Sequence, residues 1–174
     1  MRILKKKIII NPLEKVDFFS VLISSGIFTG FFPFASGTVG SLFGLVFFII
    51  PGFSDISVLS AITIAVFVLS IYTSERMMKR YGDDPSVVVI DEIIGMWITV
   101  LIVIIWFSES IALTPLALMI SFLAFRIFDI FKLFPANYFD KMKSGFGIVM
   151  DDVVSGIYAG VLSSLVIILI KKLF

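Results

Sequence analysis

Long apolar segments separated by short polar stretches dominate the chain. The main apolar segments are residues 38–53, 56–73, 93–107, 111–127 and 153–170. Several are shorter than the ~20 residues that a helix needs to cross a bilayer, but polar residues at their ends can complete them. Residues 16–34 are also apolar, and their interspersed Ser and Gly are typical of a helix packed against other helices. The pattern predicts an all-α bundle of about four or five transmembrane or re-entrant helices, preceded by an N-terminal packed or amphipathic helix.

The composition places this bundle in a membrane. Hydrophobic residues make up 59% of the chain, which carries 20 Phe, well outside the range of soluble domains. Since no Gly/Ser-rich or Pro-rich linker interrupts residues 1–174, we expect a single domain. The basic start, residues 1–12, lacks a small-residue cleavage site and is interpreted as a cytoplasmic N-terminus, not as a cleaved signal peptide.

The chain contains no Cys and no His. This excludes disulfides, thiolate metal sites, Ser-His-Asp catalysis and a phosphohistidine intermediate. Any chemistry must therefore use carboxylates, hydroxyls, Lys, Arg and the backbone. Oxygen ligands of this kind suit magnesium or manganese.

The order of the segments predicts which polar stretches share a membrane face. If every segment crosses once, residues 34–38, 74–92 and 128–152 lie on one side. This side also receives most of the basic residues, so the positive-inside rule makes it cytoplasmic: Lys5, Lys6, Lys7, Arg76, Lys79, Arg80, Lys132, Lys141 and Lys143. Lys171 and Lys172 would lie on the opposite side, so either the C-terminal end breaks the rule or one short segment is re-entrant.

The first polar cluster is the sequence ASGTVGS, residues 35–41, at the start of an apolar segment. Its glycines free the backbone, and its hydroxyls can open a helix N-terminus whose N–H groups face a phosphate. A helix start that packs closely through Gly40 and Gly44 explains the same residues equally well.

The second cluster contains Asp83, Asp84, Asp91 and Glu92, and the last two are expected to begin an apolar helix. A favourable interaction with the helix dipole, worth only ~0.3–1 kcal/mol, is the simpler interpretation of such an acidic pair. We favour a metal site, because Gly95, one turn after Asp91, allows a metal or another helix to come close.

The third cluster fills residues 125–152, where charges lie between two very apolar segments. A charge at the edge of a hydrocarbon layer costs on the order of 1–3 kcal/mol unless it is paired, snorkels or binds an ion. Arg126, Asp129 and Lys132 are spaced i, i+3, i+6 and would form one stripe on a helix, for which an internal ion-pair row is the alternative interpretation.

The end of the same stretch is expected to start the last helix at the acidic pair Asp151 and Asp152. Gly156 and Gly160 follow Asp152 at one-turn intervals, which places this carboxylate above a closely packable face. Gly145 and Gly147 are expected to give the approach to this helix its flexibility.

Together the clusters predict one composite site. Carboxylates that hold a divalent metal, with cations nearby to neutralise phosphoryl oxygens, are what phosphoryl chemistry needs. Its position at the membrane surface favours a lipid substrate.

Four ordered motifs resemble the phosphatidylglycerophosphatase A family. ASGTVGS resembles its PGTxGS segment, VIDEIIGMWIT its DExxGMWIT segment, FRIFDIFKLFP its FRxFDxxKPxP segment, and GFGIVMDDVVSGIYAG its GxGIMxDDxxAGxxA segment. Together they cover about residues 26–160. Ser36 and Leu133 stand where the family usually has Pro, and Val149 and Met150 depart from the GxGIM segment; these differences affect backbone shape more than chemistry.

The resemblance implies a magnesium-dependent hydrolase of the bacterial inner membrane, with several membrane passes and a cytoplasmic active site. It would convert phosphatidylglycerophosphate to phosphatidylglycerol and phosphate. Its expected partners are a phospholipid substrate and the lipid bilayer, and no nucleic acid. By position, the implied catalytic residues are Asp129, Asp151 and Asp152, the metal ligands Asp91, Glu92, Asp129 and Asp152, and the phosphate-binding residues Thr38, Ser41, Arg126 and Lys132.

Other interpretations remain at this point. A cation transporter or channel would also place carboxylates in a membrane, but no inverted repeat is apparent. A CDP-alcohol phosphotransferase would also use carboxylates and magnesium, but its spaced Asp-Gly…Ala-Arg…Gly…Asp pattern is missing. The sequence leaves open whether water attacks directly or an aspartyl-phosphate forms, which carboxylate is the base, and the oligomeric state.

Overall fold

The computed structural model describes residues 11 and 13–173, so Lys5, Lys6 and Lys7 of the basic start lie outside the described residues. Every regular element within the described residues is helical, which confirms the all-α class. In chain order the elements are α1 (Phe18–Ser24), η1 (Thr29–Phe31), α2 (Ser36–Val46), η2 (Phe47–Ile49), α3 (Ile56–Tyr81), α4 (Ile90–Trp106), α5 (Glu109–Ala112), α6 (Pro115–Phe131), α7 (Ala136–Phe139) and α8 (Gly145–Leu173).

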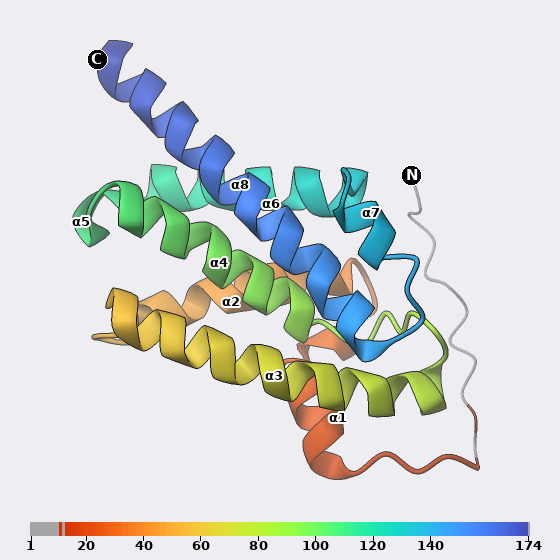
Figure 1. Cartoon of the computed structure of the whole chain (residues 1–174). Helices are drawn as coiled ribbons and strands as arrows, with labels where there is room; N and C mark the ends of the chain where they lie inside the picture. Colours follow the sequence, from red (N-terminus) through yellow and green to blue (C-terminus); the bar gives the residue numbers. More distant parts are fainter. Residues whose placement is uncertain (1–10, 12, 174) are drawn as a thin grey trace.

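Helix α4 forms the centre of the bundle. It packs most extensively against α8, and also against α2, α3 and α6; Figure 1 shows α8 lying along α4. Apolar side chains on several sides of α4 are therefore fully buried, among them Ile94, Met96, Val100 and Val103. The acidic start of this buried helix is thereby enclosed by the other helices.

Glycines allow α8 to approach α4 closely. A methyl group at Gly156 would lie 2.5 Å from the carbonyl oxygen of Gly95, and one at Gly160 would lie 3.0 Å from that of Thr99. The Thr99 hydroxyl donates to the carbonyl of Gly95 (2.8 Å) and reaches that of Gly156 (3.2 Å). The closely packable face predicted below Asp152 is confirmed, and it packs within the chain.

Helix α2 uses small residues in the same way. Gly40 lies against Val89 and Gly44 against Ile93, while the indole N–H of Trp97 donates to the carbonyl of Gly44 (2.9 Å). The Gly40/Gly44 pair thus fixes α2 on α4.

The N-terminal helix α1 is packed, as predicted, but is only seven residues long. Asp17 caps it by accepting from the backbone N–H (2.9 Å) and the hydroxyl (2.8 Å) of Ser20, and these hydrogen bonds lower the pKa of the Asp17 carboxyl. Ser20 and Ser24 are buried. The carbonyl of Ser24 accepts from the N–H of Val89 (2.8 Å), so this segment holds the chain that leads into α4.

Two helices, α3 and α8, are long and apolar enough to cross a membrane by length and composition. Only 22% of the apolar window of α3 and 39% of that of α8 is buried within the protein. Much of their apolar surface is thus left for lipid, which indicates membrane association. The other apolar helices are shorter, so the predicted set of four or five crossings is not confirmed.

The prediction that Asp151 and Asp152 begin the last helix is wrong, because α8 starts at Gly145. The carboxylate of Glu75 on α3 accepts from the backbone N–H of Gly145 (2.5 Å) and so supports a helix start that precedes the acidic pair. A side chain at Gly145 would meet the backbone of α3. The sequence predicted that Gly145 provides flexibility. In the structure it instead allows α8 to pack closely against α3.

Candidate active site

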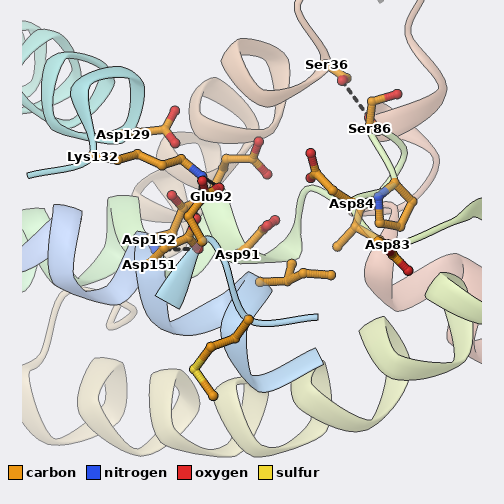
Figure 2. Close-up of a pocket in the computed structure, with 15 residues that line it drawn as sticks. Ser36, Asp83, Asp84, Ser86, Asp91, Glu92, Asp129, Lys132, Asp151 and Asp152 are labelled. Atoms are coloured by element: carbon orange, nitrogen blue, oxygen red, sulfur yellow. Dashed lines mark hydrogen bonds and ion pairs between the residues drawn. The ribbon is translucent and has the colours of Figure 1, made fainter. Parts of the chain in front are cut away.

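A cavity of about 170 Å³ opens where the starts of α4 and α8 meet the end of α6. Figure 2 shows carboxylates and one lysine converging on it. Its lining comes from all three predicted polar clusters, so their convergence is confirmed: Ser36, Asp83, Asp84, Pro85, Ser86, Val88, Asp91, Glu92, Asp129, Lys132, Asp140, Met142, Ile148, Asp151 and Asp152.

Three carboxylates form the inner part of this cavity. Asp91 and Glu92 come from the first turn of α4, and Asp152 comes from α8. Each offers an oxygen within 4.8 Å of the others. Asp91 Oδ1, Glu92 Oε2 and Asp152 Oδ1 are buried and have no hydrogen-bond donor among the described residues. We call these three residues the carboxylate triad.

The triad assembles because its neighbours are small. Gly95 lets the backbone of α8 come close beside Asp152, since a methyl group there would lie 2.8 Å from the Asp152 carbonyl oxygen. Gly37 makes room for the carboxylate of Glu92, which a methyl group at this position would strike. Gly37 of the first polar cluster therefore provides space that the acidic site needs.

Lys132 closes the outer side of the cavity. It ends α6 in the left-handed conformation (φ 44°), and its ammonium donates to Asp151 and to Asp140 (2.5 Å). Burial favours the neutral amine, but the two carboxylates outweigh it and raise the pKa of Lys132 above its ordinary value. Lys132 is therefore a fixed cation beside the triad.

Arg126 and Asp129 form an ion pair on α6 (2.8 Å), which confirms that the predicted stripe is helical. Arg126 also donates to the hydroxyl of Ser41 (3.3 Å), which itself donates to the carbonyl of Gly37 (2.8 Å). Asp129 lines the cavity but is not part of the triad. Among the residues that the structure describes, Thr38, Ser41 and Arg126 are not part of the lining.

Several cavity residues belong to the predicted clusters but were not assigned a catalytic, metal-binding or phosphate-binding role. Ser36 replaces Thr38 as the hydroxyl at the cavity, and it donates to the carbonyl of Ser86 (2.6 Å). Asp83, which pairs with Lys143 (2.6 Å), lies with Asp84 on the opposite wall from Lys132. Asp140 follows the short helix α7, and only its place in a charged stretch between apolar segments hinted at a role.

The donor set of the triad fits a divalent cation. Hard carboxylate oxygens are the ligands that magnesium prefers in proteins. The three carboxylates repel one another, and each has a buried oxygen that lacks the hydrogen bonds such groups normally make. A cation held by Asp91, Glu92 and Asp152 would remove both costs.

Comparison with known proteins decides the family. A sequence model of the phosphatidylglycerophosphatase A family matches residues 22–167. The chain belongs to this family. It is 32% identical over 154 residues to phosphatidylglycerophosphatase A of Haemophilus influenzae, covering 86% of this chain and 90% of the relative. It is 31% identical over 144 residues to phosphatidylglycerophosphatase A of Escherichia coli, covering 81% and 80%.

A further relative carries a different name. A protein of Bacteroides thetaiotaomicron, provisionally named as a phosphatidylinositol-3-phosphatase, is 33% identical over 158 residues, covering 86% of this chain and 94% of the relative. No solved structure matches the chain. Membership of the phosphatidylglycerophosphatase A family makes the chain an enzyme, a phosphatase, and replaces the transporter and the CDP-alcohol phosphotransferase as interpretations.

Proposed function

We propose that this phosphatase removes the terminal phosphate of phosphatidylglycerophosphate in a magnesium-dependent reaction, giving phosphatidylglycerol and phosphate. The observation that carries the proposal is the triad of Asp91, Glu92 and Asp152, with its buried, unpartnered oxygens, in the same cavity as the ammonium of Lys132. Negative metal ligands beside a fixed cation match the charge requirements of phosphoryl transfer. The family assignment supports a phospholipid substrate.

In this proposal the triad holds magnesium, which when bound polarises a phosphoryl oxygen and neutralises charge that develops during transfer. Lys132 binds a second phosphate oxygen at the rim. Arg126 holds the carboxylate of Asp129 in place at the cavity wall. Asp129 and Asp151 are then the carboxylates available to orient the attacking group or to accept its proton.

The proposed location is the bacterial inner membrane, crossed several times, with the cavity at its cytoplasmic face. The cavity lies at the end of the bundle where Lys132, Lys141 and Lys143 also lie, which suits the positive-inside rule. In this arrangement the acyl chains of the substrate stay in the bilayer while its headgroup reaches the cavity. The cavity then needs to accommodate only the phosphorylated headgroup.

The substrate is tested by comparing two lipids. Purified protein with magnesium is expected to release phosphate from phosphatidylglycerophosphate at least about tenfold faster, as kcat/KM, than from phosphatidylinositol 3-phosphate, a discrimination of about 1.4 kcal/mol. Both rates are measured in the same mixed micelles. The opposite preference would assign the activity named for the Bacteroides thetaiotaomicron relative.

Asp140 is expected to position Lys132 for phosphate binding. Asp140→Asn removes one of the two carboxylates that hold the ammonium, so Lys132 would turn further toward Asp151. Because Asp140 is 43% exposed, the expected effect is moderate: KM rises about five- to tenfold with a smaller change in kcat. Steady-state kinetics check this, with partial rescue by Asp140→Glu and with Lys141→Gln as the control; an unchanged KM would contradict the role.

A further inference from the structure

A second cavity lies at the opposite end of the bundle from the triad. It has a volume of about 180 Å³ and lies between the start of α6 and the end of α8. Its lining is apolar apart from Thr114 and one lysine: Ile111, Thr114, Leu116, Ala117, Ile120, Ile167, Ile170 and Lys171. The proposed reaction makes no use of this cavity.

The distance along α8 places this cavity at the other edge of the hydrocarbon layer. Lys171 follows Asp151 by about 20 residues, which is roughly 30 Å of α-helix. This equals the ~30 Å thickness of a bilayer core. Trp106, which ends α4 and is 53% exposed, is a typical residue of a membrane interface. With the triad at one membrane face, the second cavity therefore lies at the opposite face.

Positive charge lies at one side of this cavity. The ammonium of Lys171 lies 5.4 Å from the centre of the Phe107 ring, a cation–π contact that keeps it at the mouth. Lys172, the next residue of α8, is also exposed. The N-terminus of α6 begins at Pro115 at the same end and adds a partial positive charge. The acidic residues at this end of the bundle already have partners: Asp55 caps the start of α3, and Glu109 accepts from the hydroxyl of Ser54 (3.1 Å).

We propose that this cavity is a binding site for an anionic phospholipid of the opposite leaflet. One acyl chain occupies the apolar space between α6 and α8, and the phosphate of the headgroup pairs with Lys171 and Lys172. The same site explains why two lysines stand where the positive-inside rule disfavours them, because a bound anionic headgroup neutralises them. The inference rests on the proposed membrane location of the bundle, but it does not depend on the proposed reaction, since it concerns the other end of the bundle.

A specific lipid-binding site can be distinguished from non-specific coverage by lipid because the site prefers an anionic headgroup. A bilayer in contact with an apolar surface covers it with any phospholipid, whereas paired lysines at a cavity mouth favour an anionic headgroup. The probe should be neither a phosphomonoester nor the product of the proposed reaction. Phosphatidylserine meets both conditions, and phosphatidylcholine is the uncharged comparison with the same acyl chains.

The test is lipid retention by the full-length, delipidated protein, measured by native mass spectrometry with either lipid. We expect one phosphatidylserine to bind at least fivefold more tightly than phosphatidylcholine. The double variant Lys171→Gln/Lys172→Gln should reduce this preference to less than twofold. The matched control Lys79→Gln/Lys141→Gln removes the same charge from exposed positions at the other end and should keep the preference.

The position of the lipid is tested on the unmodified chain. Phosphatidylserine with a photoreactive group in one acyl chain is expected to crosslink to residues 111–120 and 167–171. Equal retention of the two lipids, an unchanged preference in the Lys171/Lys172 variant, or crosslinks that map elsewhere would each overturn the proposal. None of these experiments measures phosphate release. Failure of the lipid-site proposal can therefore be distinguished from failure of the proposed function.

Discussion

Asp152→Asn is expected to lower phosphate release by at least about 100-fold, a loss of about 2.7 kcal/mol of transition-state stabilisation. The amide keeps the shape of the side chain but removes the charge of one member of the triad. Asp91 and Glu92 alone would then have to hold the cation. The loss should appear in kcat/KM with saturating magnesium and should be accompanied by a higher magnesium requirement.

The same variant also distinguishes a metal-binding role of Asp152 from a purely structural role. In chelator, Asp152→Asn should be at least as stable as the wild type, because it removes a charge that the other two carboxylates repel. Added magnesium should raise the melting temperature of the wild type at lower magnesium concentrations, and by more, than that of the variant. Glu14→Gln, which changes an exposed acid outside the cavity lining, is the control. A variant that lost activity because it unfolded in chelator would contradict the metal-ligand role.

Gly156→Ala is expected to disrupt the packing of α8 against α4. Its methyl group would lie 2.5 Å from the carbonyl oxygen of Gly95, and backbone atoms at a helix crossing have little room to move. We expect a loss of at least about 2 kcal/mol of stability. Activity should fall with it, because separating α4 from α8 moves Asp152 away from Asp91 and Glu92.

Gly44→Ala provides the matched comparison for this prediction. Its methyl group would meet the nearest atom, Ile93 Cα, at 3.3 Å, so a shift of a few tenths of an ångström suffices. In thermal unfolding in detergent, Gly156→Ala should therefore have a much lower melting temperature than Gly44→Ala. Equal melting temperatures for the two variants would show that close packing of α4 and α8 does not hold the site together.

The sequence predicted the helices and the meeting of the three polar clusters because both depend on strong local signals. Apolar segments locate α3, α4, α6 and α8, and the acidic pair Asp91 and Glu92 begins a helix as expected. The number of apolar segments between the clusters then places the clusters at the same end of the bundle. Glycine spacing at Gly156 and Gly160 also indicated the face along which α8 packs.

What the sequence did not reveal depends on contacts between distant residues. The start of α8 at Gly145 is supported by Glu75, which lies 70 positions earlier in the chain. Ser36, and not Thr38, lines the cavity because of where α2 begins, directly after Ala35 in the left-handed conformation. Asp140 reaches Lys132 only because the chain reverses around α7.

The most direct test of the magnesium phosphatase measures phosphate release from phosphatidylglycerophosphate by detergent-purified protein, with magnesium and with chelator, for the wild type and Asp129→Asn. Asp129 lines the cavity and is held by Arg126. The proposal predicts release that chelator abolishes and that Asp129→Asn lowers by at least about 100-fold. Folded, magnesium-supplied wild type that released no phosphate, or release unaffected by chelator, would contradict it.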